Sequence, residues 1–287
     1  MVKNIKKISV LILLLAVFVL TPSLVSAHQP RITDSTEITV VDPEISKAYY
    51  GQLSGDFDLY TINSEQPFDF YVNILVPDII DQKTDLFALI VKDKKDQEPF
   101  AFLNGVDFEW QKFHEPFGND DYLMGPEYKV QAEAGDYDIY VWSNDNTNKY
   151  ALAIGEKENF DFKEIVNAIT LIPKIKKNFF NESPVNFIFS PFGWGYILIM
   201  FAFAFIVGFI YRLIIRKLAK NSNRRVGKNI NKKDRLIRLA LAVILLLVAI
   251  LTNWCAILIF FAGFCLFEAI FSWCGLYVAL GKNTCPV

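Results

Sequence analysis

The sequence predicts an all-β extracytoplasmic sandwich followed by an α-helical membrane domain of three transmembrane helices. Three observations lead to this fold class: a short apolar run near the N-terminus, an acidic first half in which apolar and polar residues alternate, and long apolar segments in the second half. Alternation with a period of two is typical of half-buried strands, and an apolar run of about 20 residues is long enough to span a bilayer.

Residues 1–27 are predicted to be a secretory signal peptide. Basic residues precede the apolar run from Ile8 to Leu20, and small residues close the segment at Val25-Ser26-Ala27. The apolar run is shorter than the roughly 20 residues that cross a hydrocarbon core. We therefore expect cleavage after Ala27, with His28 as the mature N-terminus. The alternative is an uncleaved N-terminal anchor.

Charge differs sharply between the two halves of the chain. From His28 to Ser190 the sequence holds 29 acidic and 14 basic side chains, a net charge of 14 − 29 = −15. The stretch from Arg212 to Arg238 holds eleven basic residues and one acid, Asp234. All four cysteines follow Trp254, so the acidic domain is expected to fold on its apolar core without disulfides.

The acidic domain, residues 28–158, is predicted to be an antiparallel sandwich. Its strand segments alternate apolar and polar residues, are rich in aromatic and β-branched side chains, and are bounded by Gly, Pro, Asn or Asp. The predicted strands are 37–41, 57–62, 68–76, 86–91, 128–132, 137–142 and 150–154.

The segment 102–128 is not predicted to form strands. Long ordered loops on a rigid sandwich commonly carry binding residues, so this segment is the expected binding region. Its conspicuous aromatic, acidic and histidine residues are Trp110, Phe113, His114, Phe117, Asp120, Asp121 and Tyr122.

Three motifs of the acidic domain resemble the bacterial pre-peptidase C-terminal domain. They are the stretches Gly51 to Tyr60, Ala134 to Val141, and Tyr150 to Gly155. The resemblance implies a jelly-roll-like sandwich that binds or positions other molecules without catalysing a reaction.

Residues 159–192 are predicted to be a juxtamembrane amphipathic segment with a helix interrupted at Pro173. Two placements are equally expected: on the outer leaflet of the membrane, or packed on the sandwich. Apolar residues recur close to helical spacing, at Phe162, Ile165, Val166, Ile169, Ile172, Ile175 and Phe179.

The second half is predicted to cross the membrane three times, once at 193–211 and twice within 236–272. Thr252-Asn253 is the polar break in the longer block, so we expect a tight turn there. An exported sandwich requires the first helix to run inward. The basic loop 212–235 and the tail 273–287 then lie in the cytoplasm, as the positive-inside rule also requires. Topology therefore explains the basic loop without a nucleic-acid partner.

Glu268 is an ionisable residue deep within the apolar sequence of the predicted hairpin. Such residues are costly in a membrane and need a partner. Folding the hairpin at Thr252-Asn253 brings Glu268 level with Arg238, so an ion pair with Arg238, or with Arg235, is expected. A proton or ion relay is the alternative.

Both ends of the predicted hairpin resemble the YgaP-like inner-membrane domain, a family of two-helix membrane hairpins. Asn229 to Arg238 is similar to its N-V-G-x-x-D-R-x-x-R start, and Cys274 to Cys285 to its C-P-L-Y-x-x-L-G-x-N-T-C end. Asn231 stands where the family has glycine, and Gly275 where it has proline. The family is often fused to rhodanese sulfurtransferases, which implies sulfur or redox chemistry near the paired cysteines; this sequence contains no rhodanese.

Cys274 and Cys285 form the candidate thiol pair. Structural cysteines, a reversible dithiol, and a carrier of metal or persulfide are all open interpretations. Cys255 and Cys265 lie within the apolar sequence and are interpreted as packing or lipid-facing residues.

Two metal sites are considered in the acidic domain, although no cofactor is required. Calcium would use loops such as Asn119-Asp120-Asp121 and Asn144-Asp145-Asn146, where ordinary turn chemistry also explains the residue types. Copper would use the amine and imidazole of His28 together with His114. The sequence has no G-x-S-x-G, H-E-x-x-H or glycine-rich phosphate loop, so a non-enzymatic protein is expected.

The expected function is binding or sensing of an unidentified extracytoplasmic ligand or protein partner by a multi-pass protein of the plasma (inner) membrane. One alternative is a membrane redox or sulfur-handling component that uses Cys274 and Cys285. The other is an accessory subunit of a membrane transporter or protease complex.

Overall fold

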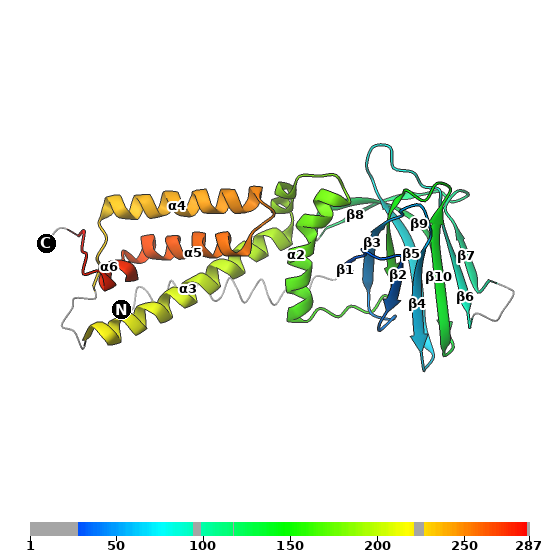
Figure 1. The fold of residues 1–287 in the computed structure, drawn as a ribbon, viewed down its shortest axis with the longest axis horizontal. Helices are drawn as coiled ribbons and strands as arrows, with labels where there is room; N and C mark the ends of the chain where they lie inside the picture. Colours follow the sequence, from blue (N-terminus) through cyan, green and yellow to red (C-terminus); the bar gives the residue numbers. More distant parts are fainter. Residues whose placement is uncertain (1–27, 94–98, 117, 221–226, 286–287) are drawn as a thin grey trace. The chain divides into compact units, whose positions relative to one another are not determined.

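The computed structural model describes residues 28–93, 99–116, 118–220 and 227–285, which fall into two compact units (Figure 1). The sandwich unit ends at Pro191, and the helical unit begins at Phe192. The predicted signal peptide and Phe117 lie outside the described residues, so cleavage after Ala27 stays a prediction.

Two sheets build the sandwich unit (Figure 1). Sheet A has the strand order β1-β3-β11-β5-β9-β8, and sheet B has the order β2-β4-β10-β6-β7. The strands are β1 Gln29–Ile32, β2 Glu37–Val40, β3 Lys47–Gln52, β4 Asp58–Ser64, β5 Phe68–Pro77, β6 Leu86–Lys92, β7 Ala101–Asn104, β8 Gln111–Glu115, β9 Asp120–Ala132, β10 Gly135–Ser143 and β11 Lys149–Ile154.

The all-β first half is confirmed, and each of the seven predicted strands is present. The expectation that segment 102–128 lacks strands is wrong, because β7, β8 and most of β9 fall within it. Their pattern is hard to see in the sequence: β8 is an edge strand without a buried residue, and β9 contains Gly125-Pro126, residue types that are uncommon inside strands. Pairing is also not wholly antiparallel, since β1 runs parallel to β3 in sheet A and β2 runs parallel to β4 in sheet B.

The core lies between the two sheets and includes buried tyrosines whose hydroxyl groups are satisfied. The Tyr60 and Tyr150 hydroxyl oxygens lie 2.8 Å apart, and Tyr150 donates to Asp58 Oδ2 at 2.6 Å. A buried hydroxyl without a partner would cost free energy comparable to a lost hydrogen bond. These contacts therefore allow large, partly polar side chains to fill the centre of the sandwich.

Helix α2, Phe162–Asn178, packs on the sandwich, which is one of the two placements expected from sequence (Figure 1). Asp161 caps it by accepting a hydrogen bond from the Glu164 backbone nitrogen at 2.8 Å. Ile175 and the following Phe179 and Phe180 pack with residues of sheet A in one apolar cluster. Pro173 lies inside the helix without ending it.

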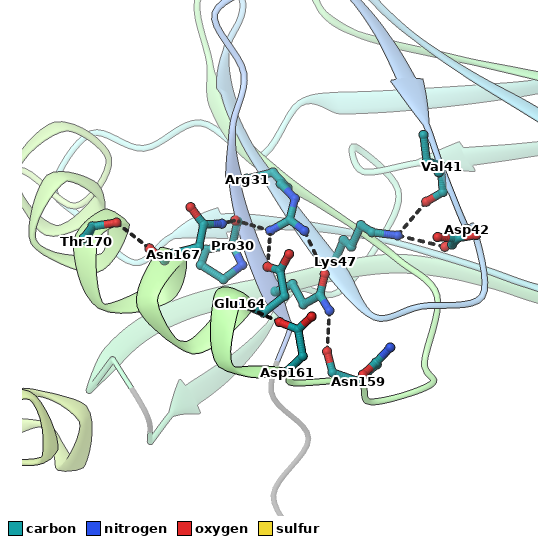
Figure 2. A network of polar contacts seen from close by, with 11 residues as sticks. Pro30, Arg31, Val41, Asp42, Lys47, Asn159, Asp161, Glu164, Asn167 and Thr170 are labelled. Atoms are coloured by element: carbon teal, nitrogen blue, oxygen red, sulfur yellow. Dashed lines mark hydrogen bonds and ion pairs between the residues drawn. The ribbon is translucent and has the colours of Figure 1, made fainter. Parts of the chain in front are cut away.

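The first turns of α2 are tied to the β1 edge of sheet A (Figure 2). Arg31 donates to Glu164 Oε2 at 2.9 Å and to Gln29 Oε1 at 2.8 Å. Gln29 in turn donates to the Asn159 carbonyl just before the helix. Charge-assisted bonds of this kind fix the orientation of the helix on the sheet.

The last turns of α2 are held by a buried ion pair. Lys176 Nζ lies 2.6 Å from Asp120 Oδ1, with side chains 0% and 4% exposed, and it also donates to the Asn119 carbonyl at 3.2 Å. Burial raises the pKa of the Asp120 carboxyl, and the neighbouring Lys176 ammonium opposes that rise. The charged state of Asp120 therefore depends on Lys176.

The helical unit contains α3 Pro191–Lys220, α4 Lys232–Leu251, α5 Ala256–Phe271 and the short α6 Gly275–Ala279. Among the described residues, one helix is long and apolar enough to cross a membrane, over Pro191–Leu218 of α3, by length and composition. Helix α5 is a shorter apolar helix. The predicted turn is present: α4 ends at Leu251 with Thr252 as its C-cap, and Asn253 and Trp254 have positive φ angles of 61° and 58°.

Small residues let α3 and α5 approach closely. A Cβ on Gly263 would lie 3.0 Å from Ala204 Cβ, and one on Gly208 would lie 2.7 Å from the Phe267 ring. The Phe209 and Phe271 ring centroids are 4.8 Å apart. This packing of small and aromatic residues is typical of helices that associate within a membrane.

Replacing Lys176 by Met should lower the free energy of unfolding of the sandwich unit by about 3–5 kcal/mol, because it leaves the Asp120 charge buried without its partner. The measurement is denaturant unfolding of the full chain in detergent, followed by near-ultraviolet circular dichroism. The matched control, Lys177→Met at the exposed neighbour, should change this free energy by less than about 0.5 kcal/mol. Equal losses in the two variants would contradict the assigned importance of the ion pair.

Candidate functional site

A groove on the sandwich unit is the candidate functional site. It encloses about 610 Å³ where β7 of sheet B lies near β8 and β9 of sheet A. Every described lining residue falls within the segment that was expected from sequence to carry the binding region. The lining comprises Phe102, Leu103, Asn104, Asp107, Phe108, Gln111, Met124, Gly125, Pro126, Glu127 and Tyr128.

Trp110 supports the wall of the groove, and its ring fits only because two glycines leave space for it. Its indole Nε1 donates to the Gly105 carbonyl at 2.8 Å, which fixes the loop between β7 and β8. A Cβ on Gly125 would lie 2.5 Å from the Trp110 ring, and one on Gly105 would lie 2.9 Å from it. Both contacts are shorter than packed side chains allow, so the ring takes the space of two absent side chains.

Asn73 sets the path of the β9 wall. This side chain is 2% exposed, and its amide donates to the carbonyls of Gly125 at 3.0 Å and Pro126 at 3.3 Å. The register between β5 and β9 shifts between Asn73 and Leu75, which marks a bulge. Bulges commonly redirect a strand beside a functional site, and here the buried amide satisfies the carbonyls that the bulge frees.

Two carboxylates at the groove, Asp107 and Glu127, are held by neutral donors. Asn104 Nδ2 donates to Asp107 Oδ2 at 2.7 Å, and the Tyr71 hydroxyl donates to Glu127 Oε2 at 2.9 Å. Burial, reinforced by the Glu127 carboxylate, raises the pKa of the Tyr71 phenol, so this group stays a neutral donor. An ionised carboxylate accepts several hydrogen bonds, so both acids retain capacity to accept from a ligand.

Aromatic rings continue from the groove onto the outer face of sheet B. Phe102 is 52% exposed and Phe108 is 38% exposed. Phe102 stacks with Phe87 and Trp142, at ring-centroid separations of 6.1 Å in each case. The site therefore combines aromatic surface, amide groups and carboxylates, which suits recognition of a ligand with both apolar and hydrogen-bond-donating parts.

The metal candidates from sequence lie outside the groove lining. Asp120 binds Lys176, and Asp121 Oδ1 lies 2.8 Å from His114 Nδ1. His28 contacts Ser46 Oγ beside the β1 edge of sheet A, whereas His114 is on β8 at the opposite edge. The structure therefore does not bring the two histidines together. Among the described residues, no three His, Cys, Asp or Glu side chains cluster to hold a metal.

In the helical unit, Glu268 and Arg238 form an ion pair, with Arg238 Nη1 donating to Glu268 Oε2. Arg235, the alternative partner, donates to the Ala269 carbonyl at 2.8 Å. The Arg238 guanidinium also lies over the Tyr277 ring, 5.3 Å from its centroid. These contacts join the start of α4 to the end of α5 and to α6.

Cys274 and Cys285 both lie beside the segment that precedes α4, and both are free thiols. Asn229 exchanges two hydrogen bonds of 2.8 Å with the Cys274 backbone, and Cys285 Sγ donates to the Ile230 carbonyl at 3.3 Å. Cys274 is 2% exposed, and burial raises the pKa of its thiol. A buried thiol that resists ionisation is typical of a structural cysteine rather than a reactive one.

Sequence reasoning missed Asn73, Gly105 and Gly125, and it named Asn229 only as the start of a motif. Asn73 gave a usable signal, because a single amide in the otherwise apolar centre of a strand needs a buried partner. The two glycines gave none, since their role follows from where Trp110 lies in three dimensions.

The fold and the long apolar helix define a membrane-anchored β-sandwich protein. Its residues 226–287 match the family described as inner membrane protein YgaP-like, transmembrane domain, which confirms the resemblance of the hairpin. Among solved structures, the pre-peptidase C-terminal domain of collagenase from Bacillus anthracis is similar at 14% identity and a TM-score of 0.25, covering 45% of this chain and 95% of that chain. No curated protein matches the chain.

The two departures from the family pattern each have a structural reason. Asn231 is the N-cap of α4 and accepts a hydrogen bond from the Asp234 backbone nitrogen at 2.8 Å, which glycine cannot do through a side chain. Gly275 abuts α3, where an added Cβ would lie 2.0 Å from the Tyr211 ring. A proline at position 275 would collide with that ring.

Replacing Gly125 by Ala should lower the free energy of unfolding of the sandwich unit by about 1–3 kcal/mol, because the added methyl group overpacks Trp110. Thermal unfolding of the full chain, followed by β-sheet circular dichroism, is the measurement. Gly227→Ala is the matched control, since a Cβ there meets nothing within 4 Å. A Gly125→Ala variant as stable as this control would contradict the assigned support of the groove.

Proposed function

We propose that the chain is a non-enzymatic, membrane-anchored binding or sensing protein whose groove takes an extracytoplasmic ligand. The groove carries this proposal: exposed aromatic rings and carboxylates line a cavity whose walls belong to two sheets. The buried Asn73 amide and the hydrogen-bonded Trp110 ring hold its walls in place, so the site is largely preformed, as ligand sites usually are. The redox alternative has less support, because Cys274 is buried.

The proposed topology places the sandwich outside the cell and three helices in the membrane. Helices α4 and α5 have 20 and 16 residues, and α4 begins with the charged run Lys232 to Arg235. The remainder of α4 has 20 − 4 = 16 residues, so each helix offers a spanning length of about 24 Å at 1.5 Å per residue. A hairpin of this length spans a bilayer of about 30 Å with modest local adjustment. The basic residues between α3 and α4 favour a cytoplasmic location for that loop.

The groove is tested by screening the full chain in lipid nanodiscs against arrays of short peptides and oligosaccharides. We expect saturable binding of at least one probe, and a loss of about tenfold or more in affinity for Phe102→Ala combined with Phe108→Ala, because truncating exposed aromatic anchors removes roughly 1–2 kcal/mol each. The control is Ile80→Ala, which removes an exposed apolar side chain, 91% accessible, that is not part of the groove. Absence of a probe whose binding depends on the groove would refute the proposal.

The topology is tested by cysteine labelling of intact cells in a background without the four native cysteines. A membrane-impermeant maleimide should modify Glu65→Cys, on the sandwich, before permeabilisation. It should modify Lys228→Cys, between α3 and α4, only afterwards. Both positions are exposed, so the lipid barrier rather than burial decides the outcome. Labelling of both positions, or of neither, in intact cells would refute this orientation.

A further inference from the structure

We infer that the ligand of the groove is an extended peptide segment that carries a lysine or arginine flanked by apolar residues. This inference rests on the proposed function and specifies the chemistry of the same site. Three observations support it: the charge of the groove, the exposure of its rings, and the continuation of its aromatic surface onto sheet B.

Charge complementarity favours a cationic group. Asp107 and Glu127 line the groove, and no lysine, arginine or histidine is among its described lining residues. Among the described residues, neither acid forms an ion pair. The nearby Lys129 forms its ion pair with Glu156, with Nζ 2.6 Å from Glu156 Oε2, and Glu127 makes a smaller contribution to the raised pKa of the Lys129 ammonium. The segment from His28 to Ser190 carries a net charge of 14 − 29 = −15, which attracts cationic ligands to the sandwich unit and speeds their encounter.

The aromatic rings favour an organic cation over a metal ion. A guanidinium or alkylammonium group binds favourably over an aromatic face, and Phe102, Phe108 and Tyr128 line the same groove as the two acids. The apolar stem of a lysine or arginine would contact these rings while its charged end reaches Asp107 or Glu127. Each of the two carboxylates accepts a hydrogen bond from a neutral donor in the protein, Asn104 or Tyr71, and not from a lysine or arginine.

The extent of the surface favours a peptide over a small amine. Phe102 belongs both to the groove and to the stack with Phe87 and Trp142, and the Phe87 and Trp142 centroids lie 5.4 Å apart. Leu89 pairs with Phe102 across β6 and β7 and lies on the same outer face. Helix α2 packs on sheet A, and no described helix of the sandwich unit packs on this face of sheet B. A peptide with apolar residues beside its cation would cover this apolar strip of Phe87, Leu89 and Trp142 and would also fill the groove.

The test measures binding of one matched pair of peptides to the full chain in nanodiscs by isothermal titration calorimetry. The first peptide is acetyl-Gly-Val-Leu-Arg-Leu-Val-Gly-amide, and its twin carries citrulline, a neutral isostere, in place of arginine. We expect the arginine peptide to bind about tenfold or more tightly than the twin. Asp107→Asn combined with Glu127→Gln, which preserves shape, should reduce that ratio to nearly one.

A second arm separates the peptide from a small cation. n-Butylguanidinium presents the same charged group without flanking residues and should bind at least ~10-fold more weakly than the arginine peptide. Leu89→Ala lies on the apolar strip and outside the groove lining. It should lower the affinity for the peptide about threefold or more and leave the affinity for butylguanidinium unchanged.

Each contrary outcome has a distinct meaning. Equal affinity of the arginine and citrulline peptides would overturn the cationic ligand. If butylguanidinium binds as tightly as the arginine peptide, the peptide hypothesis is overturned in favour of a small organic cation. A groove-dependent probe of another class, such as an oligosaccharide, would overturn this inference and leave the proposed function intact. If no probe of any class depends on Phe102 and Phe108, the proposed function itself fails.

Discussion

A buried ammonium beside a buried carboxylate, Lys176 against Asp120, is the contact on which the rest of the sandwich unit depends. Both side chains are buried, so the charges are tolerated because they lie 2.6 Å apart, and Glu182 places a second carboxylate 3.9 Å from Lys176. Asp120 begins β9, which continues into the groove wall at Met124 to Tyr128. Lys176 lies in the last turn of α2, shortly before α3 begins. One ion pair thus joins the strand that forms a wall of the groove to the last turn of α2.

The strands with strong alternation and the long apolar helices were predictable, because period and length are local properties of the sequence. The sequence did not predict the edge strands β1 and β8, because an edge strand need not alternate. It did not predict the parallel pairings either, because the direction of pairing is set by residues distant in the sequence. Placement of α2 was undecidable from its pattern, because an apolar stripe suits a sheet and a lipid surface equally. Lys176 in that stripe was the missed sign, as a cation buried at 0% exposure needs an anion in the protein.

For the candidate site, the groove falls within the segment expected to carry the binding region, but none of the residues named there as conspicuous is among its described lining residues. The aromatic and acidic content of 102–128 pointed to binding, and the lining falls entirely within it. The residues judged conspicuous, Asp120, Asp121 and His114, are used in structural pairs. Asp107 and Glu127 looked like ordinary solvated acids among many, and only the fold, with Asp107 between β7 and β8 and Glu127 on β9, places them around one cavity.

The missing side chain at Gly275 has a consequence for how this hairpin relates to others of its family. The ring of Tyr211, on a helix outside the matched region 226–287, occupies the volume that a proline there would need. The hairpin of this chain is thus shaped to accept a third helix. Positions 211 and 275 should accordingly covary among proteins that join such a hairpin to a preceding span, with proline returning wherever the aromatic ring is lost. Exchange of hairpins between such proteins would be governed by this steric match rather than by overall sequence similarity.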